Sequence, residues 1–233
     1  MRMSRNAIVL AATLTLSAQL LWAGEGVPHW SGRIRGYDSK DYPIKGLAGQ
    51  TLDVRLQTRH GATYFNLLPP GSKDVAMFNG QFGDNHYHGV LPDDGTYVVR
   101  VYMMRAAARR QESARFTVDV ELGGHPLSAL SASEDRLVKG TRYHAQARIA
   151  CTPPDARAQQ CSAGVIRRGR DGTATLVIAL PGEGHRRILF VAGQPLASDA
   201  MAPLQAARGA GDTTEVRIDT EQYQVPDALL SGG

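Results

Sequence analysis

The chain alternates polar and apolar residues in short runs, and glycine or proline separates most of these runs. The clearest run is Thr-Leu-Asp-Val-Arg-Leu-Gln-Thr at 51–58, in which apolar residues recur at every second position. A period of two predicts a strand with one buried face. With this run, the predicted strands before residue 123 are 31–38, 41–44, 62–68, 74–78, 86–91, 96–103 and 113–122. About eight short strands joined by turns predict an all-β fold, a jelly-roll-like β-sandwich.

The remainder of the chain divides into a linker and a second β-rich block. Residues 123–139 are rich in Gly, Pro, Ser and Ala without a period, which is typical of a linker, with a short helix possible at 131–138. The block that follows is predicted to be a small β-meander domain, with a hairpin turn at Asp171-Gly172 and a loop of small residues at 202–211. Its predicted strands are 142–149, 163–168, 173–180, 186–191, 214–218 and 222–225. The expected domains are therefore 24–122 and 140–233.

The N-terminus has the pattern of a secretory signal peptide, 1–23. Arg2 and Arg5 precede an uncharged apolar run at 7–21, and Ala23 is a small residue suited to cleavage. The alternative is an uncleaved anchor, but the run is shorter than the roughly 20 residues that a spanning helix needs. We therefore expect an exported protein, located in the periplasm, without stable membrane insertion after the signal is removed.

Charge and cysteine content fit an exported protein that does not bind nucleic acid. Removing Arg2 and Arg5 from the 26 basic residues leaves 24 against 22 acidic ones, a net charge of about +2. Such a small excess does not indicate a nucleic-acid partner, although the clustering of arginines matters. The two cysteines, Cys151 and Cys161, flank a short proline-containing loop. In an exported chain this pair is most simply a disulfide bond, because a metal site would need more ligands.

The sequence contains no recognisable catalytic or cofactor-binding set. It has no Gly-x-Ser-x-Gly, no His-Glu-x-x-His and no phosphate-binding glycine loop, so we expect neither an enzyme nor a cofactor. His86 and His88 would share one strand face and could in principle bind a metal ion, but no third ligand is apparent beside them. Asp93 and Asp94 are better explained as turn residues than as an acid/base pair.

A basic segment, 105–110, follows the predicted strand 96–103. Its sequence is Arg-Ala-Ala-Ala-Arg-Arg, and both Ala and Arg favour helices. One helical turn would place Arg105 and Arg109 on a common face, where their planar guanidinium groups suit carboxylates or phosphates. The alternative is a solvated basic loop, or internal pairing with Glu112 and Asp94.

Two motifs stand out in the first domain. The first is Ser31-Gly32-x-Ile34-x-Gly36-Tyr37-Asp38, and the second, more specific one is Leu91-Pro92-x-x-Gly95-x-Tyr97-x-x-Arg100-Val101-x-x-x-Arg105-x-x-Ala108-Arg109. With these motifs the domain resembles the periplasmic inhibitors of goose-type lysozyme of Gram-negative bacteria. The resemblance covers roughly residues 30–122 and implies a small β-sandwich, similar to bacterial pre-peptidase C-terminal domains. It also implies that goose-type lysozyme is the partner and that an exposed surface enters the active-site cleft. By motif position, Tyr37, Arg105 and Arg109 would contact that cleft.

The second domain departs from the family, whose inhibitors are essentially one domain. It resembles bacterial domains of unknown function, and its role is not implied by the resemblance. The sequence thus favours a cell-envelope protein that inhibits goose-type lysozyme. The alternative is a non-inhibitory envelope module that binds a glycan or an envelope protein through the sandwich. A hydrolase is a third and less favoured reading, because no nucleophile–base set is visible.

Overall fold

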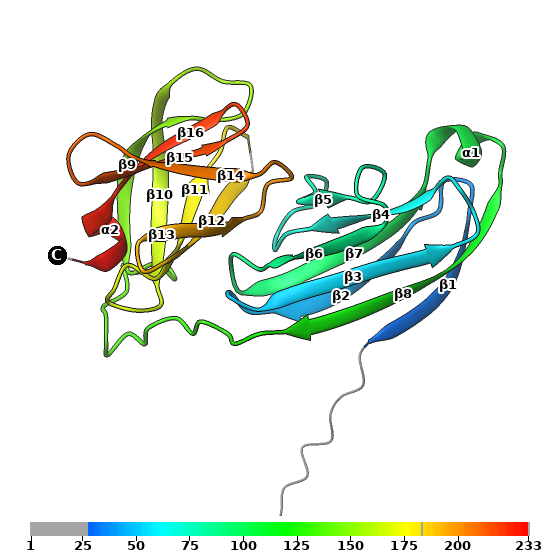
Figure 1. Cartoon of the computed structure of the whole chain (residues 1–233), viewed down its shortest axis with the longest axis horizontal. Coiled ribbons are helices and arrows are strands. Elements are labelled where there is room, and N and C mark those ends of the chain that lie inside the picture. The colour runs from blue at the N-terminus through cyan, green and yellow to red at the C-terminus, as the bar shows by residue number, and fades with distance from the viewer. Residues whose placement is uncertain (1–27, 183, 233) are drawn as a thin grey trace, which may run out of the picture.

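The computed structural model describes residues 28–182 and 184–232, and the predicted signal peptide lies outside these residues. The regular structure of the described chain is predominantly β-strand, with two helices of five residues each, so the all-β prediction is confirmed. Its strands fall into two groups of eight, on either side of the segment 124–144 (Figure 1).

The first eight strands form two antiparallel sheets with the order β1-β8-β3-β6 and β2-β7-β4-β5. The pairs β1–β8, β2–β7, β3–β6 and β4–β5 show that the chain folds as one long ribbon doubled back on itself. This is the jelly-roll arrangement, so the prediction for the first domain is confirmed. The strands are β1 (His29–Arg35), β2 (Lys40–Gly46), β3 (Thr51–Thr58), β4 (Thr63–Leu68), β5 (Phe78–Asn79), β6 (His86–Val90), β7 (Gly95–Met103) and β8 (Ser113–Gly123).

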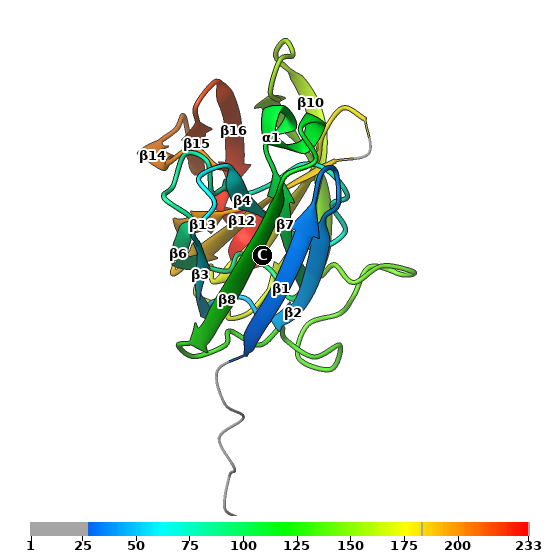
Figure 2. The ribbon, with the colours of Figure 1, turned by 90° about the vertical axis from the view of Figure 1, so that its right-hand side faces the viewer.

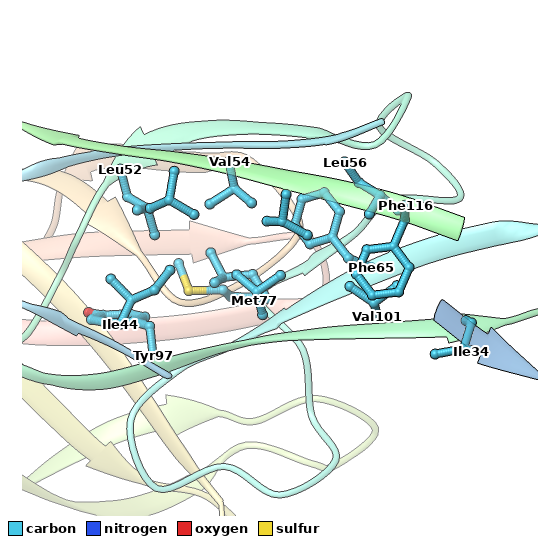
Figure 3. Close-up of a cluster of buried hydrophobic side chains, with 14 of the residues drawn as sticks. Ile34, Ile44, Leu52, Val54, Leu56, Phe65, Met77, Tyr97, Val101 and Phe116 are labelled. Atoms are coloured by element: carbon cyan, nitrogen blue, oxygen red, sulfur yellow. The ribbon is translucent and has the colours of Figure 1, made fainter. Parts of the chain in front are cut away.

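The core of the sandwich forms from the inward residues of the alternating runs. Leu52, Val54 and Leu56 of β3 point toward Phe65 and Val101 of the opposite sheet (Figure 3). The polar residues between them remain at the surface, as a period of two requires. The hydrophobic pattern of each strand therefore determines which face packs inward.

The last eight strands form one antiparallel sheet with a separate core. Its order is β13-β12-β11-β10-β9-β16-β15-β14, and the two edge strands β13 and β14 contact each other, so the sheet curls around its core. The strands are β9 (Ala145–Thr152), β10 (Gln159–Arg167), β11 (Ala174–Ala179), β12 (His185–Val191), β13 (Gln194–Ser198), β14 (Leu204–Arg208), β15 (Thr213–Ile218) and β16 (Glu221–Pro226). A second β-rich unit is thus confirmed, whereas the exact domain boundaries stay a prediction.

Three local predictions were wrong. A strand at 74–78 is not formed, because Ser72 makes a turn with Val75, and only Phe78–Asn79 pairs with β4. Residues 131–138 make a single turn instead of a helix, because the Leu130 amide donates to Arg167 of β10 and the Val138 amide donates forward to the Tyr143 carbonyl, which is not a helical hydrogen bond. The supposed loop 202–211 contains β14, which pairs along its whole length with β15.

An ionic network joins the two groups of strands. Asp93, in the turn before β7, is fully buried and pairs with Arg142, Arg168 and Arg187 of the second group. Its neighbour Asp94 binds Arg168 at 3.0 Å. As predicted for turn residues, Asp94 accepts a hydrogen bond from a backbone amide, that of Ala48. The ion pairs of both aspartates, however, are made with arginines of the second unit.

The network continues into the second unit through buried carboxylates. Asp199 binds both Arg186 and Arg187, and Glu221 binds Arg186. Four arginines therefore face four carboxylates, which balances the buried charge. Such pairing is what makes burial of these groups tolerable.

Candidate functional site

The basic segment forms the short helix α1 (Arg105–Arg109), as predicted. Ala107 and Ala108 are buried, and Ala107 belongs to the sandwich core. Small side chains on this face let the helix pack closely on the sandwich. The two arginines stand on the exposed part of the turn, four residues apart, so they project in a similar direction.

Arg105 and Arg109 make no ion pair or side-chain hydrogen bond with any other residue in the described ranges. The two proposed internal partners are occupied elsewhere. Glu112 accepts from Arg110 at 2.5 Å and contacts His60 at 2.8 Å, and Asp94 binds Arg168. The hydrogen bonds from Arg110 and then from His60 hold the pKa of Glu112 below its usual value. Internal pairing therefore does not neutralise the two arginines.

Tyr37 lies in the turn between β1 and β2, and the residue is 67% exposed. The preceding Gly36 has φ = +55°, and its amide donates to the carbonyl of Glu112 at 2.9 Å. A Cβ atom on Gly36 would meet the side chain of Gln111 at 2.8 Å. The Tyr37 turn is thus packed against the connection that follows α1, and the structure brings all three predicted contact residues to one end of the sandwich.

This end of the sandwich, which we call the basic end, comprises residues 31–38, 57–60 and 104–117. It holds seven arginines against two acidic residues, a net charge of +5, whereas the whole 233-residue chain carries +4. The arginines that we did not single out in the sequence are Arg33, Arg35, Arg59 and Arg115. They are far apart in the chain, so only the pairing of β1 and β3 with β8 brings them together.

The basic end is remote from the second β unit. It lies at the far end of the sandwich from the β9–β16 sheet (Figure 1). Strand β7 has nine residues and connects the buried Asp93 turn to α1, so the two ends are about 30 Å apart. Asp93 and Asp94 therefore belong to the junction between the units and not to the candidate site.

His86 and His88 share a strand face, as predicted, and both bind Asp53 of β3 at 3.0 Å. Burial raises the pKa of Asp53, but hydrogen bonds from His86, His88 and Arg55 outweigh it and hold that pKa at about 2. Among the described residues, no group of three or more His, Cys, Asp and Glu side chains is arranged to hold a metal ion. The two histidines are explained by their contacts with Asp53.

Cys151 and Cys161 form a disulfide bond between β9 and β10, as predicted. Both residues are buried in the core of the second unit, at a distance from the basic end. Within residues 28–182 and 184–232, no helix has both the length and the apolar content needed to cross a bilayer.

Comparison with known proteins relates about half of the chain to lysozyme inhibitors. No family model matches the chain. A protein of Escherichia coli K12 named inhibitor of g-type lysozyme is 30% identical over 131 residues, which cover 51% of this chain and 95% of that relative. Among solved structures, the periplasmic lysozyme inhibitor of g-type lysozyme from Aeromonas hydrophila is 32% identical, covering 42% of this chain and 88% of that one, with a TM-score of 0.39. The corresponding Salmonella Typhimurium protein is 26% identical over 42% and 89% of the two chains, with a TM-score of 0.34.

Proposed function

The chain belongs to the family of the inhibitor of g-type lysozyme, and from this premise we propose that it inhibits g-type lysozyme by inserting Arg105 and Arg109 into the active-site cleft. The observation that carries the proposal is the presence of two exposed arginines on one rigid helical turn, without an internal ionic partner among the described residues. Tyr37 lies on the neighbouring turn and is the third proposed contact.

The chemistry of lysozyme explains why arginines suit this role. A glycoside hydrolase keeps a carboxylic acid in its cleft to protonate the glycosidic oxygen, and usually a second carboxylate beside it. A guanidinium group can bind such a carboxylate through two parallel hydrogen bonds, which are stronger than bonds between neutral groups. An inhibitor that holds this carboxylate blocks proton transfer and also excludes the substrate.

Rigidity of the contact residues also supports the proposal. Ala107 anchors α1 to the core, and the Gly36 amide fixes the Tyr37 turn to the same connection. Because the backbone that carries these residues is already anchored, binding needs no ordering of the two turns, and only side-chain entropy is lost. Tyr37 would add a stiff aromatic anchor next to the charged pair, which is the usual composition of an interface hot spot.

We further propose that the protein acts in the periplasm and is not an enzyme. The predicted signal peptide and the disulfide bond both fit an oxidising compartment outside the cytoplasm. Mature protein recovered from a periplasmic extract should begin near residue 24, and recovery only from the cytoplasm would contradict this location.

The proposal is tested by assaying this mature protein against goose-type, chicken-type and invertebrate-type lysozymes. We expect inhibition of the goose type, and we expect Arg105→Ala/Arg109→Ala to weaken it about 100-fold or more, since each hot-spot contact contributes about 2 kcal/mol. Arg55→Ala is the matched control, because Arg55 is an exposed sandwich arginine that already pairs with Asp53. It should inhibit like the wild type.

The result that would overturn the proposal is a lack of inhibition of all three lysozyme types at micromolar concentrations of folded protein. Equal loss of inhibition in Arg55→Ala and in the double variant would also contradict it, because the effect would then reflect net charge and not these two positions.

A further inference from the structure

Three arginines of the basic end gather on the outer face of the β1-β8-β3-β6 sheet. Arg33 of β1 is the direct cross-strand neighbour of Arg115 of β8, and Arg59 follows the end of β3 on the other side of β8. All three are exposed, while their neighbours Ile34, Ala114 and Phe116 point into the core. The strands β1 and β8 lie side by side below α1 (Figure 2).

None of these three guanidinium groups has an ionic partner among the described residues. The other half of the same sheet face is different, because it carries acidic side chains, and two of these, Asp119 and Asp53, have partners. There, Asp119 contacts His29 and Gln57, and Asp53 contacts Arg55. Like charges placed directly opposite each other destabilise a sheet, so the Arg33–Arg115 pair opposes stability and is not a device that supports the fold.

The arginines border a shallow depression of about 970 Å³ in the sheet surface. Apart from the arginines, its surface comes largely from small or uncharged polar residues such as Ser31, Gly32, Gln57, Ser113 and Thr117. At Gly32 an added Cβ atom would point inward and meet the Phe116 ring at 2.6 Å, so glycine lets β1 pack closely over the core behind this face. A second depression of about 520 Å³ continues toward Arg35, Gln111 and Asp38, the last being the only acidic group along this lining.

We propose that this face binds an acidic polysaccharide strand, with its carboxylates on Arg33, Arg59 and Arg115 and its hydroxyls on the polar floor. Fixed, unpaired guanidinium groups complement the anionic groups, and hydroxyl and amide side chains complement the sugar hydroxyls. A protein partner is less well matched, because none of the large exposed apolar side chains of the described chain lines the depression. The depression shares the basic end with the candidate lysozyme contacts, but Tyr37, Arg105 and Arg109 are not among its lining residues, so the proposed binding does not rest on lysozyme inhibition.

The test measures binding of the mature, full-length protein to polygalacturonate, with uncharged dextran as the control polymer. Binding is expected at low ionic strength, about 50 mM salt, and should weaken as salt screens the charges. Arg33→Gln/Arg115→Gln should bind at least about tenfold more weakly. The matched control is Arg55→Gln, which removes a paired arginine from the same sheet face and should bind within about twofold of the wild type.

Three outcomes would overturn the proposal. These are absence of polygalacturonate binding by the wild type, equal binding to dextran, and equal loss of binding in Arg55→Gln and in the double variant. Folding is checked by thermal unfolding, where Arg33→Gln/Arg115→Gln should be at least as stable as the wild type because a like-charge pair is removed.

Lysozyme inhibition provides an independent measurement. The double variant should inhibit goose-type lysozyme like the wild type. If it loses inhibition while no protein form binds polygalacturonate, the face belongs to a protein interface and the polysaccharide proposal is wrong. If polymer binding follows the expectation but the wild type does not inhibit lysozyme, only the proposed inhibitory function fails.

Discussion

Gly36 has a backbone conformation that glycine adopts far more readily than other residues, and it supports the turn that carries Tyr37. Its φ of +55° is left-handed, so Gly36→Ala should lower the free energy of unfolding by about 1–2 kcal/mol. The added Cβ would also displace Gln111 and loosen the contact with the α1 connection. Urea unfolding measures the first effect, and weaker lysozyme inhibition would report the second. Gly61→Ala is the matched control, since its Cβ meets nothing within 4 Å and stability should be unchanged.

Asp53 should make stability depend on pH in the acid range. Its pKa is about 2 in the folded protein and near 3.8 without its partners, so the unfolded chain binds the proton first as pH falls. The stabilisation by this group is therefore complete above about pH 4–5 and is lost as pH falls from about 4 to 2. The difference in unfolding free energy between the wild type and Asp53→Asn should shrink over that interval. A difference that stays constant down to pH 2 would contradict the assignment to Asp53 and its partners His86, His88 and Arg55.

The exposure of individual residues was predicted best where it depends only on the residue type and its near neighbours in the chain. Tyr37 and the two α1 arginines are polar or amphipathic residues in turn or helix-forming contexts, and all three are exposed as expected. The aspartates 93 and 94 were read only as turn residues. Their burial depends on arginines that lie 49 to 94 positions further along the chain, and no local pattern contains that information.

At the scale of elements, regular alternation was a reliable guide. Strand β3 has the predicted bounds, and most other strands differ by a few residues, because alternation determines the buried face and turn residues mark the ends. Two of the three failures, at 131–138 and 202–211, occurred where composition was used instead of periodicity. Small residues at 202–211 indicated a loop, but β14 is an edge strand stabilised by hydrogen bonds to β15, which do not depend on side-chain size.

Helix α1 was predictable because its short sequence combines two signals. Alanines favour the helical turn and also allow close packing, and the arginines can remain only at the surface. The grouping of Arg33, Arg59 and Arg115 was not predictable, since it depends on which strands pair with β8. The positions of Tyr37, Arg105 and Arg109 at the candidate site were thus available from the sequence, whereas the neighbouring arginines of the sheet face were not.

For the whole molecule, the buried ionic network should couple the two β units during unfolding. Asp93→Asn leaves three arginines with one fewer carboxylate, and removing one member of a buried pair typically costs about 3–5 kcal/mol. We expect the variant to unfold in two calorimetric transitions, and the segment 124–144 to be cleaved faster by a protease. Asp219→Asn, in the exposed turn between β15 and β16, is the control and should behave like the wild type.

An Asp93→Asn variant with the melting profile and protease resistance of the wild type would contradict this coupling. Such a result would also weaken the proposed division into domains 24–122 and 140–233. Two separate domains joined by these ion pairs should unfold independently once the pairs are broken.

The doubled ribbon of the sandwich also determines how the protein is tethered. Because β1 pairs with β8, the chain enters at His29 and leaves after Gly123 at the same end of the sheet, opposite α1. Every covalent attachment of the sandwich is therefore made at that end. A fusion partner, a surface linker or the second β unit can be attached at that end without covering α1. Helix α1 therefore stays accessible when the protein meets a larger particle.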